Sequence, residues 1–135
     1  MLPRKTVTMQ QPDVGTKRDD RSDVSVVDLD AAVLRLDGDW DLLSDLAGFF
    51  FEDGRDAFAR LQTSIDAANW PEAVRAAHSI KGLFRTFDAS AAATVAAECE
   101  ASCRAESTAV RERLPELEAN LHAVETALRQ FQANR

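Results

Sequence analysis

The chain has 135 residues, which suffices for one domain and leaves little room for a second. Its 16 Lys and Arg residues are outnumbered by 23 Asp and Glu residues, giving a formal net charge of -7. A nucleic-acid-binding surface needs a dense basic patch, so this balance argues against a nucleic-acid partner. Hydrophobic residues make up 45% of the chain, enough to build a packed core.

The N-terminal segment differs in composition from the rest of the chain. Residues 1–24 are polar, mixed in charge and without a periodic apolar face, which predicts a flexible tail ahead of a domain at 25–135. The segment lacks the apolar centre of a signal peptide, and no apolar run approaches the ~20 residues that span a bilayer. We therefore expect a cytoplasmic, free-standing protein that does not enter a membrane.

After the tail, a short helix is predicted over 28–36, followed by a turn at Asp37-Gly38. Asp39 can cap a long helix that reaches about residue 68. Gly54 lies inside this helix and need not end it. The helical spacing is carried by Leu42, Leu43, Leu46, Phe49, Phe50, Phe58, Leu61 and Ile65.

The next helix has the strongest start signal. Asn69 supplies a capping side chain, Pro71 falls in the first turn, and Glu72 follows the cap by three residues. This combination predicts a helix that runs to about Phe87.

Two more helices complete the prediction. Asp88 or Ser90 can cap a helix that reaches about residue 107, and Pro115 falls in the first turn of a last helix that ends near residue 132. Four long helices, one short helix and no strand candidate predict an all-α fold. An antiparallel four-helix bundle with a short extra N-terminal helix buries these apolar faces with short connections.

The helix at 70–87 divides into two faces. One face is apolar and predicts core packing by Ala73, Ala77, Ile80, Phe84 and Phe87. On the other face, His78, Lys81, Gly82 and Arg85 follow the spacing i, i+3, i+4, i+7. An imidazole nitrogen can act as a nucleophile, an ammonium group can offset phosphoryl charge, and a missing side chain lets a partner approach. The pattern predicts a phosphate-accepting site, and the alternative is a solvated face with an inert histidine.

Residues 77–82, AHSIKG, resemble the signature of histidine phosphotransfer (HPt) domains, in which Lys follows the His by three residues and Gly by four. The resemblance continues through 36–43, Phe50 and 69–70 and on to Glu100, covering about residues 27–107. It implies a four-helix bundle that is phosphorylated on Nε2 of His78 and exchanges the phosphoryl group with an aspartate of response-regulator receiver domains. A hybrid sensor kinase is the other expected partner.

The resemblance also implies roles for individual residues. Lys81 matches the lysine that contacts the phosphoryl group, and Gly82 matches the glycine that leaves clearance for the partner. Glu100 matches an acceptor that bonds Nδ1–H of the His, and fixing Nδ1 as a donor leaves Nε2 as the nucleophile. We place Arg85 with Gly82 in partner access and docking. Lys81 and Glu100 are thus expected to act on different groups, the phosphoryl group and the imidazole.

The expected activity is that of a monomeric phosphoryl carrier, not of an enzyme, without ATP binding or autokinase activity. No cofactor and no metal site are expected. Magnesium would come from the receiver, because the His78 face offers no carboxylate cluster to hold it.

The sequence departs from the family pattern at three positions. Leu83 and Phe84 stand where small residues are usual after the Gly, and Asp88 stands where Gly is frequent. Phe84 falls on the core face, where small partners such as Ala92 and Ala96 can make room for it. Leu83 and Asp88 bear on partner specificity and on the shape of the helix end.

Three other classes of protein compete with this interpretation. The first is a structural bundle whose His78 is inert. The second is a zinc protein, since two His and two Cys are enough for a tetrahedral site, but the close ligand spacings of zinc motifs are missing. We instead expect Cys99 and Cys103 to be reduced thiols, because side chains four apart on a helix form a disulfide awkwardly. The third is a kinase fragment, which would need an acidic residue and then Pro shortly after the His, where this chain has Ser79 and no nearby Pro.

Three consecutive phenylalanines and a second histidine lie outside the motif. Consecutive helical residues lie ~100° apart, so Phe49, Phe50 and Phe51 cannot all point inward. We expect one exposed ring, suited to docking of a receiver. The alternative is burial under the short first helix. His122 is expected at the surface or at its boundary.

Overall fold

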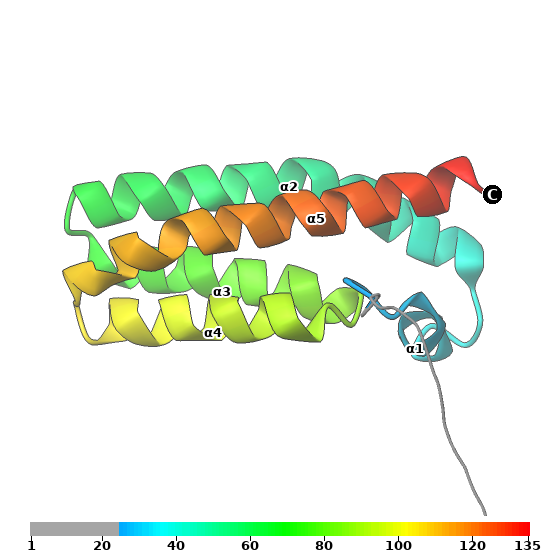
Figure 1. Ribbon diagram of the computed structural model, residues 1–135, viewed down its shortest axis with the longest axis horizontal. Helices are drawn as coiled ribbons and strands as arrows, with labels where there is room; N and C mark the ends of the chain where they lie inside the picture. Colours follow the sequence, from blue (N-terminus) through cyan, green and yellow to red (C-terminus); the bar gives the residue numbers. More distant parts are fainter. Residues whose placement is uncertain (1–24) are drawn as a thin grey trace, which may run out of the picture.

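The computed structural model describes residues 25–135, so the tail expected at 1–24 lies outside the described residues. No strand occurs between residues 25 and 135. In Figure 1, α2 and α5 lie together on one side of the bundle and α3 and α4 on the other, with successive helices antiparallel. The all-α bundle is therefore confirmed. Its elements are α1 (Leu29–Leu34), α2 (Trp40–Asp66), α3 (Trp70–Thr86), α4 (Ser90–Arg104), the 3-10 helix η2 (Thr108–Arg113) and α5 (Leu114–Ala133).

Three of the predicted helix starts are confirmed by their caps. Asp28 accepts from the backbone N–H of residue 31 at 3.1 Å, and Asp39 accepts from that of residue 42 at 3.0 Å. Asn69 accepts from the N–H of residue 72 at 3.4 Å, with Pro71 in the first turn. Each cap satisfies one of the backbone donors that a helix leaves unpaired at its start. Short polar residues therefore determine where α1, α2 and α3 begin.

The prediction for the start of α4 is wrong. Ala89 occupies the N-cap position and makes no side-chain capping bond. Asp88 instead ends α3 in the left-handed conformation, with φ +50, and the N–H of Ala89 bonds the carbonyl of Phe84 at 3.0 Å. This is the backbone geometry that favours glycine at a helix end, and Asp is among the few other residues that tolerate it. Ser90 is already the first helical residue.

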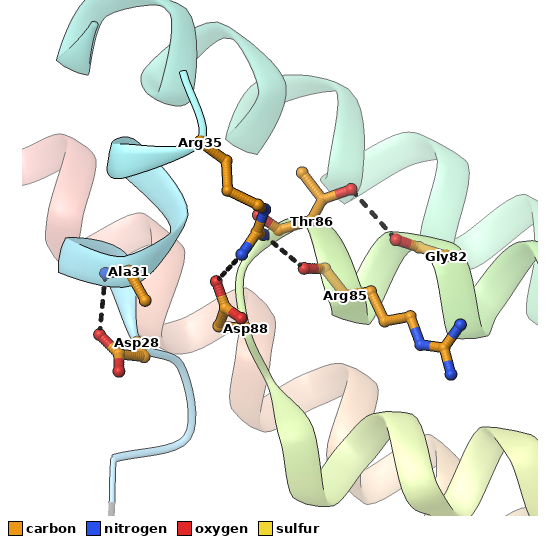
Figure 2. Close-up of polar contacts among 7 residues, drawn as sticks. All are labelled: Asp28, Ala31, Arg35, Gly82, Arg85, Thr86 and Asp88. Atoms are coloured by element: carbon orange, nitrogen blue, oxygen red, sulfur yellow. Dashed lines mark hydrogen bonds and ion pairs between the residues drawn. The ribbon is translucent and has the colours of Figure 1, made fainter. Parts of the chain in front are cut away.

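Arg35 joins α1 to the C-terminal end of α3 (Figure 2). Its guanidinium donates to the carbonyls of Arg85 and Thr86, at 2.9 and 3.3 Å, and pairs with the Asp88 carboxylate at 2.6 Å. The N–H of Asp28 adds a bond to the carbonyl of residue 87 at 3.1 Å. The guanidinium thus satisfies the Thr86 carbonyl and adds a second donor to the Arg85 carbonyl, which also accepts from the N–H of Asp88 at 3.1 Å. Asp88 serves this contact instead of capping α4.

The core lies between the four long helices and confirms the predicted apolar face of α3. Ala73, Ala77, Ile80, Phe84 and Phe87 are all buried. The ring of Phe50 from α2 lies 6.3 Å from that of Phe84 and 5.8 Å from that of Phe87, centroid to centroid, the latter pair edge-on. Such tilted and edge-on aromatic pairs are favourable beyond the area they bury. They explain how the core holds a large residue at position 84.

The buried face of α4 consists of small side chains, with Ala92, Ala93, Val95, Ala96, Cys99 and Cys103 among its buried residues. Small residues at a helix contact allow the backbones to approach closely. α4 ends at Arg104, three residues before the predicted end, and η2 follows it. None of the helices between residues 25 and 135 combines the length and apolar character needed to cross a membrane.

Candidate functional site

His78 projects from the outer face of α3. Its side chain is 65% exposed, and its Nδ1 lies 3.1 Å from Oε2 of Glu100 on α4. Within residues 25–135, Nε2 makes no hydrogen bond. A carboxylate can only accept, so this contact places the ring proton on Nδ1 and leaves the lone pair on Nε2. The geometry therefore presents a nucleophilic nitrogen to solvent.

Glu100 is the one charged residue that is buried between residues 25 and 135, with a side chain only 6% exposed. Its Oε1 accepts from Lys81 Nζ at 2.7 Å, and its Oε2 accepts from His78 and from Arg104 Nη2, the latter at 2.7 Å. Burial alone would raise the pKa of this carboxyl group, but the hydrogen bonds from Lys81, Arg104 and His78 outweigh it and lower the pKa from 4.5 to about 2. The group is held as a carboxylate beneath the imidazole.

Lys81 forms an ion pair with Glu100 that the sequence did not predict. Its side chain is only 16% exposed, because the ammonium group turns toward α4 to pair with the carboxylate. The sequence assigned Lys81 and Glu100 to different groups, and the structure joins them in one ion pair. The positive charge still lies one helical turn from His78.

Gly82 leaves open space beside His78. A Cβ atom built at this position meets no heavy atom within 4 Å. Gly82 also lines two surface grooves, one between α3 and α4 and one between α2 and α3, where it faces Asp53 and Asp56. No close packing requires the glycine, so its consequence is an unobstructed approach to the imidazole.

Arg85 is exposed one turn beyond Lys81, toward the C-terminal end of α3. Its guanidinium forms no ion pair within the described part of the chain, while its backbone carbonyl accepts from Arg35. Figure 2 shows the side chain of Arg85 extending away from Asp88. The positive charge remains available to a partner.

Arg104 is the residue of this cluster that sequence reasoning missed. It follows Glu100 by four residues on α4, the spacing at which Glu and Arg pair on a helix surface, so the signal was present. The family resemblance placed Glu100 against His78, but nothing in the sequence indicated that this carboxylate would be buried and would bring Arg104 to the same site. The exposed ring expected among the three phenylalanines is Phe49, which is 64% exposed, whereas Phe50 is buried.

The candidate metal ligands are scattered. Between residues 25 and 135, no group of three or more His, Cys, Asp or Glu side chains is placed to hold a metal ion. Cys99 and Cys103 are buried free thiols, and burial raises the pKa of Cys99 to about 11. A thiol with so high a pKa is a poor thiolate ligand or nucleophile near neutral pH. His122 is exposed and lines a groove between α2 and α5.

The fold and this face of α3 define a helical bundle with an exposed, carboxylate-oriented histidine. The family model of the Hpt domain matches residues 45–133, and the chain belongs to this family. Members of the family are phosphoryl carriers rather than kinases, and they act with response-regulator and kinase domains in phosphorelays.

One solved structure supports the fold. The chain is similar to the crystal structure of histidine-containing phosphotransfer protein B (HptB) from Pseudomonas aeruginosa PAO1, with a TM-score of 0.75 and 18% identity. The match covers 83% of this chain and 98% of that one. A search of curated proteins gave no match.

Proposed function

We propose that the protein accepts a phosphoryl group on Nε2 of His78 and passes it to or from the aspartate of a receiver domain. One observation carries this proposal: an exposed imidazole whose Nδ1 lies 3.1 Å from a buried carboxylate. An inert surface histidine does not require a buried charge beneath it, because burying a charge is costly unless it is paired. Family membership supports the same chemistry.

The transfer step follows from this geometry. The Nε2 lone pair attacks the phosphorus of the receiver's aspartyl phosphate, a P–N bond forms, and the P–O bond to the aspartate breaks and releases its carboxylate. Because Nδ1 keeps its proton, the ring becomes positively charged as the bond forms. Glu100 would stabilise that charge through the bond to Nδ1, and Lys81, which pairs with the same carboxylate, would offset charge on the phosphoryl oxygens. Reversal of these steps returns the phosphoryl group to a receiver.

The surface around His78 suits a protein partner. Gly82 gives clearance and Arg85 presents a free positive charge, and farther from His78 the ring of Phe49 is exposed on α2, one turn before Asp53. We propose that receiver domains and a hybrid sensor kinase dock here on a monomer. The chain would neither bind ATP nor phosphorylate itself, and the cytoplasmic location expected from the sequence stays a prediction.

The test is phosphoryl transfer from a panel of purified receiver domains charged with radiolabelled phosphate. We expect label to move to the wild-type protein and not to His78→Gln, with the circular dichroism spectrum unchanged. The labelled protein should lose phosphate in acid and keep it in alkali, as a phosphoramidate does. Label retained by His78→Gln would refute the proposal, and label that is stable in acid and lost in alkali would indicate an acyl phosphate elsewhere.

A further inference from the structure

The strongest unassigned feature is the sharing of one carboxylate oxygen by two donors. Oε2 of Glu100 accepts from His78 Nδ1 at 3.1 Å and from Arg104 Nη2 at 2.7 Å. Both nitrogens bond the same oxygen, so they lie no more than about 6 Å apart, a distance at which charges interact appreciably. Arg104 is therefore part of the immediate surroundings of the imidazole, although it comes from α4.

A carboxylate in this position creates an electrostatic difficulty for a phosphoryl carrier. A phosphoryl group carries close to two negative charges near neutral pH. On Nε2 it would be separated from Glu100 by only the width of the imidazole, which is inside the Debye length of about 8 Å at physiological ionic strength. The carboxylate that orients the ring would thus repel the group that the ring is to carry.

The charges around Glu100 resolve this difficulty. Lys81 alone would make the cluster neutral, and Arg104 adds one net positive charge on the side of the imidazole. We propose that Arg104 is a positioning residue of the phosphotransfer site, holding the Glu100 carboxylate on Nδ1 and cancelling its repulsion of the phosphoryl group. This inference rests on the proposed function of His78.

An ordinary helix-surface ion pair would not have this consequence. The chain offers a comparison on α5, where Arg129 pairs with Glu125 at the same spacing and at 2.9 Å. That carboxylate contacts Arg55 and no histidine. Arg129→Gln therefore removes an equivalent pair without touching the His78 site and serves as the matched control.

The experiment is a double-mutant cycle on Arg104 and Glu100. A receiver domain phosphorylated with acetyl phosphate is the donor, and both the transfer rate and the half-life of phosphorylated His78 are measured. We expect Arg104→Gln to lower the transfer rate about fivefold in the wild-type background. The same change in the Glu100→Gln background should alter it less than about twofold, because no carboxylate charge then remains to offset. Arg104→Lys should restore most of the rate, and Arg129→Gln should leave it unchanged.

A second measurement is independent of phosphorylation. Carbon NMR titration of the Glu100 carboxyl group should show its pKa, about 2 in the wild type, rising in Arg104→Gln and not in Arg129→Gln. If Arg104→Gln lowered the transfer rate by the same factor in both backgrounds, the role of Arg104 would be overturned and the proposed function would stay intact. A rise in the Glu100 pKa with no change in transfer would have the same consequence. A wild-type protein that accepts phosphate from no receiver would overturn the proposed function itself.

Discussion

Glu100 should make the stability of the bundle depend on pH in a way that a single substitution removes. Folding lowers the pKa of this carboxyl group from 4.5 to about 2. Such a group stabilises the folded state fully above pH 4.5, and the stabilisation is lost as the pH falls toward 2. At about 1.4 kcal/mol per pKa unit, the whole contribution is roughly 3 kcal/mol, of which roughly 2 kcal/mol is lost by pH 3.

The perturbation is Glu100→Gln, which keeps an acceptor oxygen for His78 but cannot ionise. Urea unfolding followed by circular dichroism gives the free energy of unfolding at several pH values from 7 to 3. The wild type should exceed the variant in stability at pH 7, and the difference should shrink by roughly 2 kcal/mol at pH 3. Other carboxyl groups titrate equally in both proteins and cancel. Glu118→Gln, at an exposed position of α5, should keep the wild-type dependence. Parallel stability curves for the wild type and Glu100→Gln would refute the reasoning.

Three further substitutions test other parts of the structure. Gly82→Ala should raise the free energy of unfolding in urea by up to about 1 kcal/mol, because the added Cβ meets no atom within 4 Å. Gly82→Gln should slow phosphotransfer by crowding the site, and a wild-type transfer rate for this variant would contradict the clearance argument. Phe84→Ala should lower the free energy of unfolding by about 3–5 kcal/mol in the same assay, because Phe84 is buried. Phe49→Ala should lower it little and should weaken receiver binding in a titration. Equal losses of stability in the two variants would contradict the described burial. Arg35→Ala should accelerate amide hydrogen exchange in α1 and leave α2 to α5 protected; unchanged exchange in α1 would show that the Arg35 contacts do not hold it.

The sequence predicted most of the fold because local signals agreed with tertiary packing. Capping at Asp39 and Asn69 and the apolar face of α3 each use information carried within a few residues. The cap predicted for α4 was wrong because the prediction used only the residues near the start of that helix. Asp88 has the side chain of an N-cap but also tolerates the left-handed end of α3, and the contact with Arg35, 53 residues away, favours the second role.

The family resemblance predicted the contact between His78 and Glu100, and the structure adds two contacts of that carboxylate that the sequence did not predict. The spacing of His78, Lys81 and Gly82 indicates one exposed face, and the family resemblance adds Glu100. The ion pair between Lys81 and Glu100 depends on how closely α3 and α4 approach, which periodicity does not encode. Arg104 was visible as a helix-surface partner of Glu100, but its place beside the imidazole follows only from the burial of that carboxylate.

The small side chains on the buried face of α4 determine how closely α4 approaches α3, and therefore how the imidazole of His78 is held. Glu100 must bridge from one helix to the next, so the spacing between α3 and α4 fixes whether its carboxylate meets Nδ1 of His78. Ala96 lies in the core, and a larger residue there would push the helices apart and lengthen that bond. Such changes would alter how firmly the ring is oriented and would also widen the groove between α3 and α4 that Gly82 and Arg85 line. The small residues of α4 therefore bear both on the orientation of the imidazole and on the shape of the surface beside it.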